Sequence, residues 1–156
     1  MKRGHPGRLW AALAMLALLA AVTVPAGAQR GRTLPGLRGG QLSEAELARG
    51  ATVLVVWASW SPRCRDVVER ANQIAEGWGG RARVATVNFQ EEPDAIESFL
   101  AGKRLAVPVY LDRDGEFSKA HAVTALPGLL VYRDGEVVFA GRLPADPDSL
   151  LRQKLD

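Results

Sequence analysis

The chain has 156 residues, of which 20 are Lys or Arg and 17 are Asp or Glu. Three of the basic residues and none of the acidic ones lie before Gln29, so residues 29–156 carry 17 charges of each sign. This balance argues against a nucleic-acid partner and against a surface for anionic membranes. The sequence holds one cysteine, Cys64, which excludes a disulfide within the chain.

Residues 1–28 have the three parts of a secretory signal peptide. A basic region at residues 2–8 is followed by a mostly apolar run at residues 9–24 and by the small residues Ala26-Gly27-Ala28. The apolar run is shorter than the roughly 20 residues that span a bilayer, so an uncleaved anchor is the weaker alternative. We predict cleavage before Gln29, a location in the periplasm or outside the cell, and no stable membrane anchor after cleavage.

The rest of the chain divides into a lead-in and one domain. Residues 29–40 are rich in Gly and Arg without periodicity, which predicts a flexible lead-in. Residues 41–156 are enough to bury a core as a single domain. Near its start, Ser43 followed by Glu46 has the pattern of a capping box, which predicts a short helix over residues 43–49.

An apolar strand followed directly by a helix start comes next. Residues 52–57 are too short and too β-branched for a helix, so they predict a strand buried on both faces. Ser61 suits an N-cap and Pro62 suits the first helical position, which predicts a helix over residues 62–76. Cys64 then lies in the first turn of this helix.

Strand and helix patterns alternate in the remaining sequence. A strand, a helix and a second strand in succession favour parallel pairing. Asp134-Gly135 between two apolar runs is a strong hairpin signal. Asp112-Arg113-Asp114-Gly115 resembles the start of a calcium loop, but the other ligands are missing, so we interpret it as a turn. The expected strands are residues 83–89, 107–111, 129–133 and 136–141, and the expected helices are residues 92–101, 116–122 and 146–155.

The segment WASWSPRC at residues 57–64 resembles the WAxWCxxC active-site segment of the thioredoxin superfamily. It is most similar to the periplasmic TlpA-like and ResA-like thiol:disulfide oxidoreductases. Residues 107–115, 123–128 and 129–141 are similar, in the same order, to that family's FPVxxDxxG motif, its VxxxP loop and its closing hairpin. The resemblance covers residues 40–156. It implies an α/β thioredoxin fold, with a central mixed β-sheet flanked by helices and a TlpA-like inserted helix and strand.

The resemblance also identifies departures at the site. Ser61 stands where the family has its first, nucleophilic cysteine, and Cys64 stands at the position of the second, resolving cysteine. Val67 and Val55 stand where family members carry a glutamate and a buried aspartate, so both candidate carboxylates for handling the proton of Cys64 are absent. Thiol exchange needs a thiolate and a second thiol close by. We therefore expect a degenerate Ser-x-x-Cys site in a redox-inactive binding or accessory module.

A single-thiol redox enzyme is the alternative. If Cys64 is exposed, it is the catalytic residue and can attack a partner disulfide or a peroxide. The Ser-x-x-Cys spacing is similar to that of peroxiredoxins, but these carry a proline seven residues before the cysteine, where this sequence has Trp57. The reactivity of the thiol therefore separates a disulfide reductase or peroxidase-like enzyme from a binding module.

The resemblance further implies a peptide-binding groove. In the family, the loop matched by Leu126-Pro127 contains a cis-proline beside the active cysteines and hydrogen-bonds extended substrate chains. We expect a cis bond here and an apolar groove for a protein or peptide partner, lined by Trp60, Ser61, Leu126 and Pro127. Gly128 stands where the family often has threonine, so a side-chain contact is missing at that position.

Metal binding has weak support in the sequence. His121 is the only histidine after residue 28, and one cysteine with one histidine cannot complete a zinc or copper site. We expect His121 at the surface or half-buried. No metal, no cofactor and a monomeric state are expected.

Overall fold

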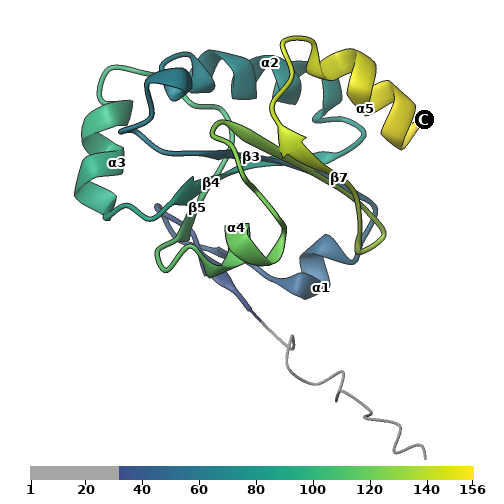
Figure 1. Cartoon of the computed structure of the whole chain (residues 1–156), viewed down its shortest axis with the longest axis horizontal. Coiled ribbons are helices and arrows are strands. Elements are labelled where there is room, and N and C mark those ends of the chain that lie inside the picture. The colour runs from purple at the N-terminus through teal and green to yellow at the C-terminus, as the bar shows by residue number, and fades with distance from the viewer. Residues whose placement is uncertain (1–31) are drawn as a thin grey trace, which may run out of the picture.

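A five-stranded mixed sheet forms the centre of the computed structural model, which describes residues 32–156 (Figure 1). The strand order is β5-β4-β3-β6-β7. β3, β4 and β5 are parallel, whereas β6 is antiparallel to both β3 and β7. The strands are β3 (Ala51–Trp57), β4 (Arg83–Phe89), β5 (Val109–Asp112), β6 (Gly128–Arg133) and β7 (Glu136–Arg142). The signal-peptide prediction for residues 1–28 lies outside the described residues.

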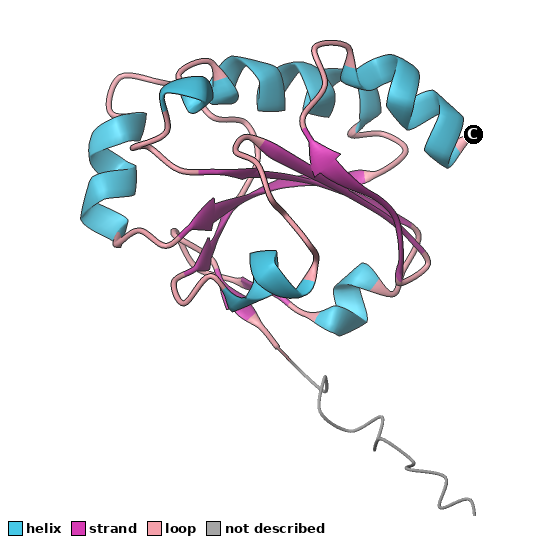
Figure 2. Cartoon of the chain, viewed as in Figure 1, coloured by secondary structure: helices cyan, strands magenta, loops and turns pink. Residues whose placement is uncertain are grey.

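Helices cover both faces of this sheet (Figure 2). One face carries α2 (Val67–Trp78), α3 (Pro93–Leu100) and α5 (Pro147–Leu155), and the other carries α1 (Glu44–Leu47) and α4 (Glu116–Ala120). The expected α/β fold is confirmed, with α3 and β5 as the helix and strand between the β3-α2-β4 unit and the β6-β7 hairpin. No helix in residues 32–156 is long and apolar enough to cross a membrane.

The central strand β3 is buried on both faces, as its continuous apolar sequence predicts. Val53, Val55 and Trp57 pack in the core that also holds residues of α2, α3 and α5. Leu54 and Val56 pack in the second core, on the side of α1 and α4. Side chains alternate along a strand, so one apolar run supplies both cores.

The helix predicted over residues 62–76 is interrupted. Its first part is a 3₁₀ turn, η1 (Pro62–Cys64), in which the Cys64 N–H donates to the Ser61 carbonyl three residues earlier at 3.0 Å. α2 begins only at Val67, because Asp66, with φ −99° and ψ 10°, does not have helical backbone angles. Over a single turn, apolar spacing does not distinguish a 3₁₀ turn from an α-helix.

Residues 34–42 are ordered, which corrects the prediction of a flexible lead-in over residues 29–40. β1 (Leu34–Pro35) pairs antiparallel with β2 (Gln41–Leu42), and the intervening turn includes two glycines with positive φ. Leu34 is 4% exposed. The Leu37 N–H donates to the Val109 carbonyl at 2.8 Å, which ties this hairpin to β5. The glycines of this segment therefore form a turn, and its leucines anchor it.

Two local predictions are confirmed by backbone geometry. The Ser43 N–H donates to the Glu46 carboxylate at 2.9 Å, completing the capping box of α1. Asp134 and Gly135 both have positive φ, as a tight type I′ hairpin turn requires. The Asp134 carboxylate also accepts the Gly50 N–H at 3.0 Å, so this turn is fastened to the segment before β3.

Candidate functional site

The candidate site lies at the carboxyl end of β3, where the chain turns into η1. Trp57 and Ala58 are fully buried, whereas Trp60 is 62% exposed. Ser61 is 7% exposed and Cys64 is 0% exposed. The loop therefore presents one large aromatic side chain to solvent and keeps the polar and sulfur-bearing side chains inside.

Ser61 and Cys64 are brought into contact. The Ser61 side chain forms no helix-capping hydrogen bond, so the expected N-cap role is wrong for its hydroxyl. Hydrogen bonding from the Ser61 side chain acts instead to lower the pKa of the Cys64 thiol. The backbone joins the same two residues, because the Cys64 N–H donates to the Ser61 carbonyl. Ser61 and Cys64 are thus hydrogen-bonded neighbours through the backbone of η1.

The environment of Cys64 favours its protonated form. Burial raises the pKa of the Cys64 thiol above its ordinary value, because a thiolate loses solvation in the core. The negative charges of Asp66 and Glu91 raise this pKa further. Hydrogen bonds from the Ala58 backbone and the Ser61 side chain act in the opposite direction and do not reverse the shift.

The loop before β6 reaches the same end of β3. The Leu126–Pro127 bond is cis, as predicted. Gly128 is the register partner of Val56, so Pro127, one residue earlier, lies at the end of β3 that leads into the site. Leu126 is half-buried and packs against the core cluster that contains Cys64. The groove itself stays a prediction.

Glu91 is a site residue that the sequence reasoning missed. It follows β4, and its carboxylate accepts the Ser59 N–H at 2.7 Å, the Ser59 hydroxyl, and the Asn88 side-chain amide at 2.7 Å. Its charge raises the pKa of the Cys64 thiol, whereas positions 55 and 67 carry valine and supply no carboxylate. Adjacent parallel strands end at the same edge of a sheet, which is the one sequence signal that could have placed Glu91 near this loop.

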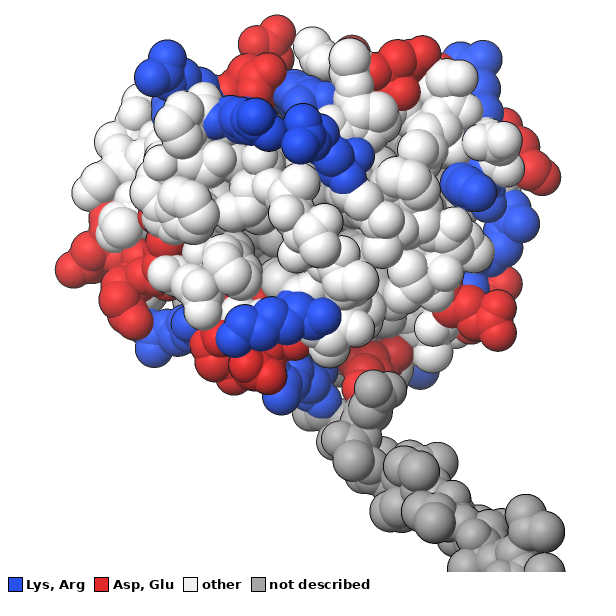
Figure 3. Space-filling view, in the orientation of Figure 1, with Lys and Arg blue, Asp and Glu red and all other residues white. Residues whose placement is uncertain are grey.

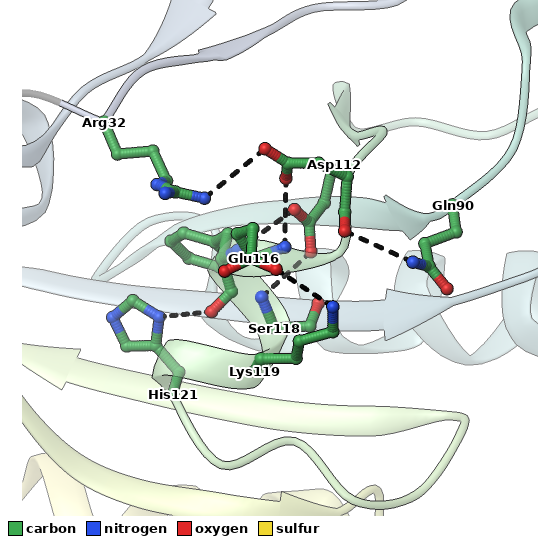
Figure 4. Close-up of polar contacts among 9 residues, drawn as sticks. Arg32, Gln90, Asp112, Glu116, Ser118, Lys119 and His121 are labelled. Atoms are coloured by element: carbon green, nitrogen blue, oxygen red, sulfur yellow. Dashed lines mark hydrogen bonds and ion pairs between the residues drawn. The ribbon is translucent and has the colours of Figure 1, made fainter.

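The turn at residues 112–115 uses its carboxylates within the fold (Figure 4). Asp112 accepts the backbone N–H groups of Phe117 at 3.1 Å and Ser118 at 2.9 Å, and Asp114 accepts that of Glu116 at 3.0 Å. These bonds satisfy the start of α4, in agreement with the interpretation as a turn. In residues 32–156, no group of three or more His, Cys, Asp or Glu side chains is arranged to hold a metal ion.

His121 lies at the other end of α4, apart from the candidate site. Its Nδ1 is 2.7 Å from the Phe117 carbonyl, and its ring packs on the Phe117 ring with centroids 4.3 Å apart. The side chain is half-buried, as expected. A packed, hydrogen-bonded ring accounts for this residue without a ligand.

Comparison with known proteins decides the family. Residues 30–140 match the AhpC/TSA family. The chain belongs to that family. The sporulation thiol-disulfide oxidoreductase A of Bacillus subtilis (strain 168) is 25% identical over 91 residues, which are 55% of each protein. The chain thus spans about half the length of this curated relative.

Solved structures agree with this assignment. A putative thiol:disulfide interchange protein DsbE from Chlorobium tepidum is 26% identical, with a TM-score of 0.68 over 79% of this chain and 89% of that one. StoA from Bacillus subtilis, at 21% identity, has the same fold, with a TM-score of 0.61 over 78% of this chain and 94% of that one. A secreted Mycobacterium tuberculosis disulfide oxidoreductase, at 24% identity, has a TM-score of 0.63 over 76% and 90% of the two chains. The predicted kinship with thioredoxin-like thiol:disulfide oxidoreductases is confirmed.

Proposed function

We propose that this protein is an exported thioredoxin-like module that binds a protein or peptide partner and does not turn over disulfides. The observation that carries the proposal is the complete burial of the Cys64 thiol, three residues after a serine and not after a second cysteine. The family resemblance puts Ser61 at the nucleophile position, and a hydroxyl cannot form a disulfide. Cys64 has no second thiol in the chain to release a mixed disulfide.

The ionisation of Cys64 supports the same conclusion. The thiolate is the reactive form of cysteine, and the ordinary thiol pKa of about 8.5 already leaves few thiolates at neutral pH. Burial and the charges of Asp66 and Glu91 raise the pKa of Cys64 above its ordinary value. Both the access and the ionisation of this thiol therefore oppose nucleophilic attack.

The surface near the loop supports a binding role. In residues 32–156, two large apolar side chains are exposed, those of Trp60 and Val137. Figure 3 shows a broad band without charged side chains across the face that carries the segment from α4 to β6. Exposed aromatic side chains and broad uncharged surfaces are each typical of interfaces. We propose an extended, uncharged peptide segment as the partner. The protein would bind it as a monomer.

Export is part of the proposal. The basic, apolar and small-residue parts of residues 1–28 support it. The similarity to a Mycobacterium tuberculosis oxidoreductase described as secreted supports it too. Intact-mass analysis of the protein recovered from the periplasm or medium tests the expected cleavage before Gln29.

A single-thiol redox enzyme acting through Cys64 remains the second candidate. The hydrogen bonds that Ala58 and Ser61 make to the sulfur favour this candidate, because they stabilise a thiolate. The two candidates differ in the reactivity of the folded protein. In the binding module, Cys64 reacts with a thiol reagent only after unfolding.

The deciding experiment is multiple-turnover reduction of insulin by dithiothreitol. We expect wild type and Cys64→Ala to give the same rate as dithiothreitol alone. Labelling of wild type by a maleimide should be at least ten-fold slower in the folded state than in urea, because Cys64 is 0% exposed. Turnover by wild type that Cys64→Ala abolishes would establish the single-thiol enzyme instead.

Binding is tested with alkylated insulin B chain as the extended peptide probe. Trp60→Ala should weaken binding by about ten-fold, the scale of a modest aromatic anchor at an interface. Val137→Ala is the matched control, because Val137 is 42% exposed and lies opposite Tyr132, away from Pro127. Equal effects of the two substitutions would contradict a binding surface at Trp60.

A further inference from the structure

One carboxylate joins the end of β4 to the loop that carries Trp60. Glu91 lies between β4 and α3, and it accepts both hydrogen-bond donors of Ser59, the backbone N–H at 2.7 Å and the hydroxyl. It also accepts the side-chain amide of Asn88 at 2.7 Å. Asn88 is buried and is the register partner of Trp57 in β3. The Glu91 carboxylate is thus held by β4 through Asn88 and by the loop after β3 through Ser59.

These bonds determine where the loop can go. Ser59 lies between buried Ala58 and exposed Trp60. With both its donors held by a single carboxylate, Ser59 has little freedom to rotate, and the direction of the chain into Trp60 is fixed. Hydrogen bonds to a charged acceptor are stronger than those to a neutral one.

The neighbouring acidic residue gives a contrast. Glu92 directs its carboxylate to Arg113 at 2.6 Å, in an exposed ion pair. This hydrogen bond joins Glu92 to the turn after β5. Among the described residues, the Glu92 side chain forms no hydrogen bond with the loop at residues 58–61. Of these two adjacent glutamates, Glu91 is therefore the one that holds the site loop.

We propose that Glu91 is a positioning residue, which through Ser59 holds in place the loop that carries Trp60 and Ser61. The inference rests on the proposed function, because it assigns Glu91 the task of presenting the peptide-binding surface. It goes beyond that function by linking the surface to the start of α3. Displacement of Glu91 would loosen the loop that carries Trp60.

The electrostatics of the thiol agree with this geometry. The charged groups that act on Cys64 are Glu91, across the loop from β4, and Asp66, at the start of α2. Arg63 and Arg65 adjoin Cys64 in sequence, and both are exposed. Loss of either negative charge therefore lowers the pKa of the thiol.

Amide hydrogen exchange at Ser59 tests the hydrogen bonds directly. In Glu91→Ala, the Ser59 amide should exchange about ten- to one-hundred-fold faster, as expected for loss of a hydrogen bond to a charged group. Glu91→Gln keeps the size of the side chain and should give an intermediate rate, which secures the test if the alanine variant folds poorly. Glu92→Ala and Asp66→Asn should leave Ser59 unchanged. Unaltered exchange in both Glu91 variants would overturn the proposal.

The pH profile of Cys64 ionisation, followed in the folded protein by the NMR shift of its Cβ carbon, separates this role from simple support of the fold. Glu91→Gln and Asp66→Asn should both move the profile to lower pH, and Glu92→Gln should not. A shift in Asp66→Asn without one in Glu91→Gln would contradict the proximity of Glu91 to the thiol.

Binding of alkylated insulin B chain distinguishes this proposal from the one on which it rests. If wild type binds the probe, Glu91→Ala should weaken binding about as much as Trp60→Ala does, and undiminished binding would contradict the positioning role. If wild type does not bind it, the proposed function fails, while the exchange of Ser59 still decides whether Glu91 holds the loop.

Discussion

Ser61 and Cys64 are hydrogen-bonded neighbours through the backbone, at the two positions where the family resemblance places thiols. A hydroxyl has no comparable acidity and cannot be oxidised to a sulfur–sulfur bond. The nearby Glu91 carboxylate is occupied by three hydrogen bonds from Ser59 and Asn88, so it is poorly placed to take a proton from Cys64. The oxygen of the Ser61 side chain, in place of a sulfur atom, therefore distinguishes this site from a dithiol site.

Ser61→Cys should create a dithiol that oxidised glutathione converts to a disulfide with Cys64. The backbone already joins the two residues by a hydrogen bond, and two thiols lose two electrons and two protons to glutathione disulfide in the process. Insulin reduction should then rise above the wild-type rate. It should recover only partly, because Val55 and Val67 supply no carboxylate and Glu91 is engaged elsewhere.

The measurement for Ser61→Cys is thiol titration together with insulin turnover, and Ser61→Ala is the control. The alanine variant should remain inactive and retain its thiol. Failure of the cysteine variant to form a disulfide would show that the two positions are held too far apart or in the wrong orientation.

At the scale of the elements, sequence patterns predicted the strands and turns whose conformation depends on neighbouring residues in the chain. The apolar runs of β3 and β4 and the Asp134-Gly135 turn could be read from the sequence, because burial and turn geometry leave few alternatives. The break after η1 could not, because one turn of apolar spacing fits both helix types. The hydrogen bond from Ser59 to Glu91 could not either, since it joins residues 32 positions apart.

The hairpin of β1 and β2 is another element that local patterns did not reveal. Its order depends on distant partners, because the Leu37 N–H donates to the Val109 carbonyl and Gly36 bridges to Tyr110. Leu34 contributes a buried side chain to the core that lies on the α1 and α4 side of the sheet. A Gly- and Arg-rich composition signals disorder only when such anchors are absent.

Leu34→Ala should therefore lower the free energy of unfolding by about 2 kcal/mol or more, the cost of removing a buried leucine side chain. Urea denaturation followed by circular dichroism measures this change. Pro35→Ala is the matched control, since Pro35 is exposed on the same strand and should have a small effect. Equal stability of Leu34→Ala and wild type would indicate that this segment is a flexible lead-in.

At the scale of the whole molecule, packing on the two faces of the sheet stabilises the fold. The ion pairs in the described residues are largely exposed, and such pairs contribute about 0 to 1 kcal/mol each. α2 and α5 are joined by a more specific contact, since the indole N–H of buried Trp78 donates to Asp148 at 2.9 Å. The single cysteine adds no covalent link.

The stability of the protein should accordingly be independent of reductant. A disulfide stabilises a fold chiefly by restricting the unfolded chain, and one cysteine cannot close a loop within a monomer. The urea midpoint of wild type should be the same with and without dithiothreitol, and size-exclusion chromatography should give a monomer in both conditions. Oxidised Ser61→Cys is the positive control, because its new disulfide makes the midpoint respond to reductant. A native wild-type size that changes with dithiothreitol in the absence of urea would mean that Cys64 forms intermolecular disulfides in the native state. That result would require a thiol that reaches solvent, and it would favour the single-thiol enzyme over the binding module.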